Sequence, residues 1–136
     1  MKRMAILATL VLAVTFTPRP AEGRDEKAPT TKDIMGKVGK PTGLYPSVAK
    51  ELREADPIWE EVQQQTKEMT KLLATLGQAT PPKGDKESWG KLTRAFADNA
   101  KALETAAAKM DLKAARDVSK KMNDSCKGCH TVHRPQ

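Results

Sequence analysis

Apolar residues recur at spacings of three and four along most of the chain after residue 31, which is typical of helices that bury one face. The clearest such segment is DPIWEEVQQQTKEMTKLLATLG, residues 56–77. We expect Asp56 to be its N-cap, Pro57 to be its first helical residue and Gly77 to end it. The predicted buried stripe of this helix consists of Ile58, Val62, Met69, Leu72, Leu73 and Leu76.

Two further helices are predicted after a polar loop over residues 78–84. The first is capped by Asp85, and its buried stripe consists of Trp89, Leu92, Phe96, Ala100, Leu103 and Ala107. The second begins near Asp111, and one face of it holds Leu112, Ala115, Val118, Met122 and Cys129. The register of this last helix therefore continues to the end of the chain.

The segment KDIMGKVGKPTGLYPSVAKELRE is less regular. Pro41, Gly43 and Pro46 must break or kink a helix there. We therefore expect a first helix in two pieces, about 31–39 and 44–53. The apolar positions that suit its buried face are Ile34, Met35, Val38, Tyr45, Val48 and Leu52.

No run of residues alternates with the two-residue period of a strand. Four helices with short connections predict an all-α fold, an antiparallel up-down-up-down four-helix bundle. We expect this domain to occupy residues 32–136, with a first helix that is broken by Pro41 and Pro46.

The first 23 residues have the pattern of a signal peptide. Lys2 and Arg3 precede an apolar run over residues 4–16, which is too short to span a bilayer of about 30 Å as a helix. We therefore predict that residues 1–23 are removed on export, that residues 24–31 form a flexible leader, and that the mature protein is periplasmic without stable membrane insertion. An uncleaved N-terminal anchor is the alternative.

The charge pattern argues against a nucleic-acid partner. The formal net charge is +7, and removing the first 23 residues, with three basic residues and one acidic residue, leaves +5. Basic and acidic side chains are interleaved along every predicted helix, as on a solvated face. Only two Phe, one Tyr and two Trp are present, too few to suggest base stacking.

Both cysteines lie in the motif CKGCH, residues 126–130. CxxCH is the attachment pattern of c-type haem. Two thiols must reach the two vinyl groups of a porphyrin, and an imidazole must reach the iron from one side of the ring. On a helix, Cys126, Cys129 and His130 leave from one face. Export agrees with this assignment, because bacteria attach haem covalently outside the cytoplasm.

Three other interpretations of the cysteines are open. A redox dithiol is normally found at a helix start within a βαβ pattern, and no strand is predicted here. A disulfide between residues three apart closes a small loop and stabilises little. A zinc site made by Cys126, Cys129, His130 and His133 has suitable ligand types but lacks the usual spacing of two pairs.

An exported, four-helix chain with CxxCH near its end resembles the class II cytochromes c, which comprise the cytochrome c′ group and its six-coordinate, Met-ligated relatives. The resemblance covers roughly residues 31–134. In the family, CxxCH is commonly followed by two residues, an aromatic and Arg; here Arg134 matches and His133 replaces the aromatic. The resemblance implies a left-handed bundle with one covalent haem c near one end and His130 as the proximal iron ligand.

The opposite side of the iron divides this family by function. A Met ligand gives a low-spin electron carrier, whereas an apolar residue leaves five-coordinate iron that binds NO or CO. Bundle geometry favours Met35, at the haem end of the first helix, over Met69, Met110 and Met122, and Met-ligated members also place their ligand near this point. Ile34 could instead be the apolar residue of a gas-binding site.

The resemblance also suggests roles around the haem. We expect His133 to pack at the haem edge rather than to bind iron, because it follows His130 on the same side of the chain. Arg134 is expected to pair with a propionate or a terminal carbonyl. The residues expected to line the pocket, or else to be simple core, are Trp89, Leu92, Leu73, Leu76 and Tyr45.

These observations predict a monohaem cytochrome that transfers single electrons between extracytoplasmic redox proteins, with His130 and Met35 as axial ligands. It is not expected to be an enzyme, because no nucleophile or acid/base group accompanies the haem. The alternatives are a five-coordinate protein that binds NO or CO, and a haem that only stabilises the bundle. The positive charge suggests an acidic patch on the partner, and the family raises the expectation of a homodimer through the first two helices.

Overall fold

The computed structural model describes residues 28–135, which form helices and no strands. The helices are α1 (Thr31–Val38), α2 (Leu44–Glu51), α3 (Trp59–Leu76), α4 (Lys86–Ala108) and α5 (Leu112–His133). The predicted all-α class is therefore confirmed for this part of the chain. The predicted signal peptide and residues 24–27 of the predicted leader lie outside the described residues, and residue 31 of that leader is already helical.

The starts of three helices follow the capping chemistry of the sequence. Asp85 accepts a hydrogen bond from the Ser88 amide (2.8 Å), and Asp111 accepts one from the Ala114 amide (2.9 Å), so both predicted aspartate caps are confirmed. At the start of α1, Thr30 and Asp33 form a reciprocal capping box. Each cap gives the first free amides of its helix an acceptor.

The start of α3 differs from the prediction. Its N-cap is Ile58 rather than Asp56, and Pro57 precedes the helix. Pro57 is buried, so the chain turns before the helix begins, and the Ile58 amide donates to the Glu51 carboxylate at 3.4 Å. Ile58 is consequently 55% exposed and was wrongly assigned to the buried stripe.

Residues 31–51 form two helices, α1 and α2, and the two prolines of this region lie in different places. Pro41 lies in the segment between α1 and α2, whereas Pro46 is the third residue of α2, where its missing N–H needs no partner. Gly43 is the N-cap of α2 and packs closely against α1. A Cβ at Gly43 would lie 2.7 Å and 2.8 Å from the carbonyl oxygens of Lys37 and Val38, so the turn needs glycine.

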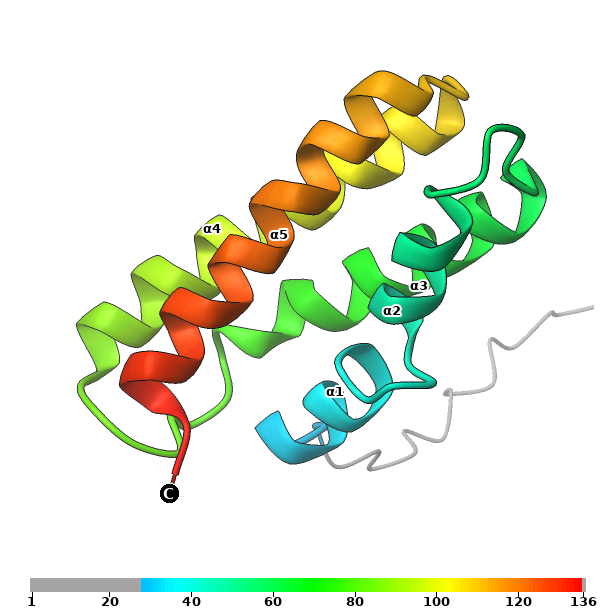
Figure 1. Ribbon diagram of the computed structural model, residues 1–136. Coiled ribbons are helices and arrows are strands. Elements are labelled where there is room, and N and C mark those ends of the chain that lie inside the picture. Colours follow the sequence, from blue (N-terminus) through cyan, green and yellow to red (C-terminus); the bar gives the residue numbers. More distant parts are fainter. Residues whose placement is uncertain (1–27, 136) are drawn as a thin grey trace, which may run out of the picture.

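α4 and α5 lie side by side, joined by residues 109–111, and α3 packs against α4 (Figure 1). α1 and α2 pack against α3 and against each other. The core draws buried apolar side chains from all five helices, including Ile34, Val48, Met69, Leu103 and Met122. None of the helices within residues 28–135 is long and apolar enough to cross a membrane.

Polar contacts connect α5 to α2 and to the residues that follow it. The Arg116 guanidinium donates to the carbonyl oxygens of Leu52 (2.6 Å) and Glu54 (3.0 Å), beyond the last turn of α2. The Tyr45 hydroxyl donates to the Ser119 carbonyl at 2.9 Å. These contacts hold α2 on α5, and a cavity opens between α5 and α1.

Candidate functional site

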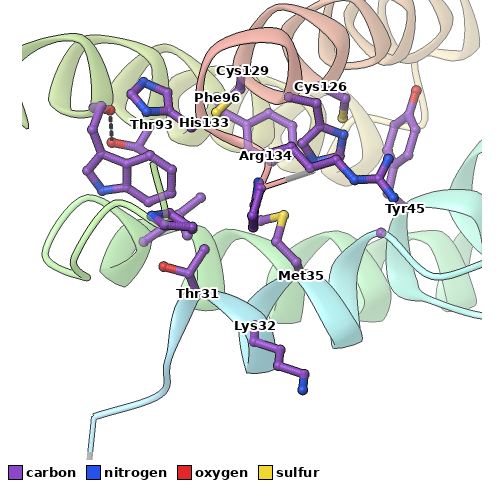
Figure 2. Close-up of a pocket in the computed structure, with 16 residues that line it drawn as sticks. Thr31, Lys32, Met35, Tyr45, Thr93, Phe96, Cys126, Cys129, His133 and Arg134 are labelled. Carbon is purple, nitrogen blue, oxygen red and sulfur yellow. Dashed lines mark hydrogen bonds between the residues drawn. The ribbon is translucent and has the colours of Figure 1, made fainter. Parts of the chain in front are cut away.

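A cavity of about 590 Å³ lies between α1 and the last turns of α5, and α2, α3 and α4 complete its wall (Figure 2). Its volume is within the range of about 300–1,000 Å³ that is usual for small-molecule and cofactor sites. Most of its lining is apolar. The lining residues are Thr31, Lys32, Met35, Gly39, Tyr45, Leu76, Pro82, Trp89, Thr93, Phe96, Cys126, Cys129, His130, His133, Arg134 and Pro135.

The cysteine motif lies in the last two turns of α5, and Cys126, Cys129 and His130 all line the cavity. Both thiols are free and half-buried. Burial raises the pKa of Cys126 and of Cys129 above the ordinary value, so both remain protonated near neutral pH. A raised pKa in the last turns of a helix is the reverse of what an activated redox dithiol requires, which argues against that interpretation.

Met35 lines the cavity from α1, on the side across from α5. Figure 2 shows its side chain directed from α1 toward the side of the pocket that holds Cys126 and Cys129. Met69 and Met122 are fully buried in the core, and Met110 is 59% exposed at the turn between α4 and α5. Among the methionines of the described residues, Met35 alone belongs to the cavity wall.

Ile34 does not lie on the cavity wall. Its side chain is fully buried in the hydrophobic core, next in sequence to Met35 but on another face of α1. This placement argues against Ile34 as an apolar residue that faces the cavity.

The remaining wall agrees in part with the sequence. Trp89, Leu76 and Tyr45 line the cavity, as expected, whereas Leu73 lies in the core. Leu92 is half-buried and belongs neither to the cavity wall nor to the core cluster. The lining residues that the sequence did not predict are Thr31, Lys32, Gly39, Pro82, Thr93, Phe96 and Pro135. Phe96 is two turns after Trp89 on the same stripe, so helical spacing could have identified it.

His133 is only 2% exposed, and both of its ring nitrogens have partners. Nδ1 lies 2.6 Å from the Lys83 carbonyl oxygen, and Nε2 lies 3.1 Å from the Ser88 hydroxyl. Within residues 28–135, no three His, Cys, Asp or Glu side chains are grouped so that they could hold a metal ion. The zinc interpretation therefore gains no support from the structure, and His133 faces the loop before α4.

The charged residues at the cavity are all basic. Lys32 and Arg134 line it, and a smaller adjoining hollow of about 390 Å³ is lined by Lys83, His130, Thr131, Arg134 and Pro135. Lys32, Lys83 and Arg134 are exposed, so the opening of the site presents positive charge to solvent. This pattern suits an anionic group at the rim of an otherwise apolar pocket.

These residues fit a haem c. The cavity supplies apolar walls, two thiols and an imidazole on one side, a thioether across from them, and cations at the rim. The indole Nε1–H of Trp89 is buried without a hydrogen-bond partner within the described residues, although the side chain lines the cavity. A buried donor of this kind normally has an acceptor, and an acidic group of a bound cofactor would supply one.

The comparison with protein families agrees with this chemistry. The family model described as Cytochrome C' matches residues 84–134, which include α4, α5 and the cysteine motif. No curated protein and no solved structure matches the chain.

Proposed function

The family match supports assigning the chain to the class II cytochromes c, the cytochrome c′ family, and on this premise we propose that it is a monohaem one-electron carrier. Its iron would have His130 and Met35 as axial ligands. The observation that supports this proposal is the position of the Met35 thioether on the cavity wall across from the cysteine motif.

Each of these side chains has a defined part. Cys126 and Cys129 would hold the haem through thioether bonds, made by adding each thiol to one vinyl group, and burial raises the pKa of both thiols. His130 and Met35 would bind the iron, and the apolar cavity wall would pack against the porphyrin. Bound haem supplies the one-electron chemistry, and a Met ligand raises its potential.

The fold we propose is an antiparallel up-down-up-down four-helix bundle in which α1 and α2 together form the first helix. The tight turn between α4 and α5 and the contacts of α3 with α4 support this arrangement. A homodimer through the first two helices is part of this proposal, by likeness to the family.

The protein is proposed to act in the periplasm after removal of residues 1–23, and to exchange electrons with other extracytoplasmic redox proteins rather than to catalyse a reaction. The exposed cations at the site, Lys32, Lys83 and Arg134, support a partner that has an acidic docking patch. Rim charges of this kind mainly raise the association rate, so the rate of electron exchange should fall as salt is added.

The absorption spectrum of the ferric and ferrous holoprotein tests the ligand set. We expect a low-spin ferrous spectrum, a weak far-red Met-to-iron band in the ferric protein, and no shift on addition of CO. Met35→Leu should abolish the far-red band and permit CO binding at little cost in stability, because the swap nearly conserves volume.

Met110→Leu is the matched control, since Met110 is exposed and lies outside the cavity. It should leave the spectrum unchanged. A wild-type protein that is high-spin and binds CO promptly would refute Met35 as a ligand and would favour the gas-binding function.

A further inference from the structure

The loop between α3 and α4, residues 77–85, contacts both sides of the cavity. On one side, the Thr31 hydroxyl at the start of α1 donates to the Thr80 carbonyl at 3.3 Å. On the other side, His133 in the last turn of α5 contacts the Lys83 carbonyl at 2.6 Å. The loop therefore connects the helix that bears Met35 with the helix turn that bears His130.

The contacts of His133 with this loop are specific. Because a carbonyl oxygen only accepts hydrogen bonds, Nδ1 of His133 must donate to Lys83, and in the neutral ring Nε2 then accepts from the Ser88 hydroxyl at 3.1 Å. The ring also meets the Trp89 indole edge-on, with centroids 5.2 Å apart and planes at 80°. One side chain thus holds the loop and the first turn of α4 on the end of α5.

Gly84 shows how closely the loop is fitted to this side chain. It has a φ of +81°, and a Cβ added there would lie 2.9 Å from Nδ1 of His133. Both the backbone conformation and the close approach require glycine. The backbone of the loop at Gly84 therefore packs directly against the His133 imidazole, with no room for a side chain between them.

We propose that His133 is a positioning residue: by holding the loop 77–85 on α5, it fixes His130 relative to Met35 across the cavity. This inference rests on the proposed function for its effect on the haem. The aromatic residue that usually stands here in the family could keep the ring contact with Trp89 but, as Phe, could make neither hydrogen bond.

The test compares three variants of the full-length holoprotein. His133→Phe keeps an aromatic ring and loses both hydrogen bonds. His133→Asn keeps a donor close to the position of Nδ1 and loses the contact with Ser88. Thr105→Ala is the matched control, because the Thr105 hydroxyl bonds within α4, to the Lys101 carbonyl at 2.9 Å, and Thr105 lines neither the cavity nor the adjoining hollow.

Three quantities are measured on each protein: amide hydrogen exchange of the non-proline residues of the loop 77–85, the far-red ferric band, and the rate of CO binding. For His133→Phe we expect loop exchange to be about tenfold faster or more, because two partly buried hydrogen bonds are lost. The far-red band should weaken and CO should bind faster. His133→Asn should be intermediate, and Thr105→Ala should match the wild type.

Unchanged loop exchange in His133→Phe would overturn the proposal. Faster exchange with an unchanged far-red band and CO rate would show a structural contact only, and would equally overturn the positioning role. If His133→Phe does not fold, Ser88→Ala, which removes only the second hydrogen bond, must show the same effects to a smaller degree. If the wild-type protein lacks the far-red band, Met35 is not an iron ligand, and the proposed effect of His133 on Met35 and the haem is refuted as well. In that case the rate of loop exchange still decides whether His133 holds the loop on α5.

Discussion

The two sides of the cavity are built in different ways. One side is the pair α4 and α5, which are 23 and 22 residues long, start with aspartate caps and lie side by side. The other side is α1 and α2, which have eight residues each and rest on α3. The two thiols belong to the long pair and Met35 belongs to the short one (Figure 2). His130, in the last turn of α5, also belongs to the long pair.

This difference explains how firmly each group is placed. In a long helix, a buried stripe over several turns fixes the register, so the cysteine motif is positioned by many contacts at once. A helix of eight residues is not stable alone in water, because isolated helices need about 12–15 residues. The position of α1, and with it Met35, therefore depends on a few particular contacts, and these can be removed one at a time.

The largest effect is expected at Gly43. In Gly43→Ala, the new Cβ would meet three backbone carbonyl oxygens at 2.7–2.9 Å, and backbone atoms cannot move aside as a side chain can. We expect the free energy of unfolding to fall by about 3 kcal/mol, as for severe overpacking. Chemical denaturation followed by far-UV circular dichroism measures it.

Gly90→Ala in α4 is the matched control for this change. A Cβ at Gly90 has no atom within 4 Å apart from its own helix and neighbours, so alanine should stabilise the helix by about 0.5–1 kcal/mol. Similar effects of the two substitutions would contradict the contrast between the short and the long helices.

The same contrast explains what the sequence could and could not predict. The stripes of α4 and α5 identified Phe96, Ala100, Leu103 and Met122 as buried, and their aspartate caps marked the starts. The start of α3 was misplaced because Asp56 and Pro57 have ideal local chemistry, yet burial of Pro57 turns the chain first. Packing of Pro57 therefore outweighed the local preference for a helix start at Asp56, and a short sequence pattern carries no information about such packing.

The site shows the same limit. The spacing of CxxCH places Cys126, Cys129 and His130 on one face, because helix geometry alone decides it. The contacts of His133 with Lys83 and Ser88 join residues 50 and 45 positions apart, and no local pattern encodes them. Leu73 and Leu92 were assigned to the cavity from their stripes, but Leu73 lies in the core and Leu92 is half-buried outside both core and cavity wall, because a stripe identifies one face of a helix and not what covers each residue.

A smaller effect is expected at the start of α1. Hydrogen bonds from the Thr30 hydroxyl (2.7 Å) and backbone amide (3.1 Å) hold the pKa of Asp33 below its ordinary value. Thr30→Ala should lower the free energy of unfolding by about 1 kcal/mol at pH 7, as for other N-caps. Thr30→Ser keeps the hydroxyl and should match the wild type.

The pH dependence of this effect has a definite sign. Because the pKa of Asp33 is lowered on folding, its contribution to stability is present above the unfolded pKa of about 4 and is lost as the pH falls through the folded value. The stability difference between the wild type and Thr30→Ala should therefore narrow below about pH 4. A difference that stays constant from pH 7 to pH 2.5 would show that Asp33 takes no part in the cap.

The smallest effect is expected in the long pair, at the turn that joins α4 to α5. Met110 has a φ of +52° and is 59% exposed. The Met110 amide donates to Ala107 and the Asp111 amide to Ala106, which is the Schellman ending of a helix, where glycine normally takes the position of Met110. Met110→Gly should therefore raise the free energy of unfolding by about 0.5–1 kcal/mol. Met110→Ala removes the same side chain but keeps a residue with a Cβ in the left-handed conformation, so it should leave the free energy of unfolding unchanged. Equal denaturation midpoints for the two variants would show that the left-handed conformation of residue 110 does not lower the stability.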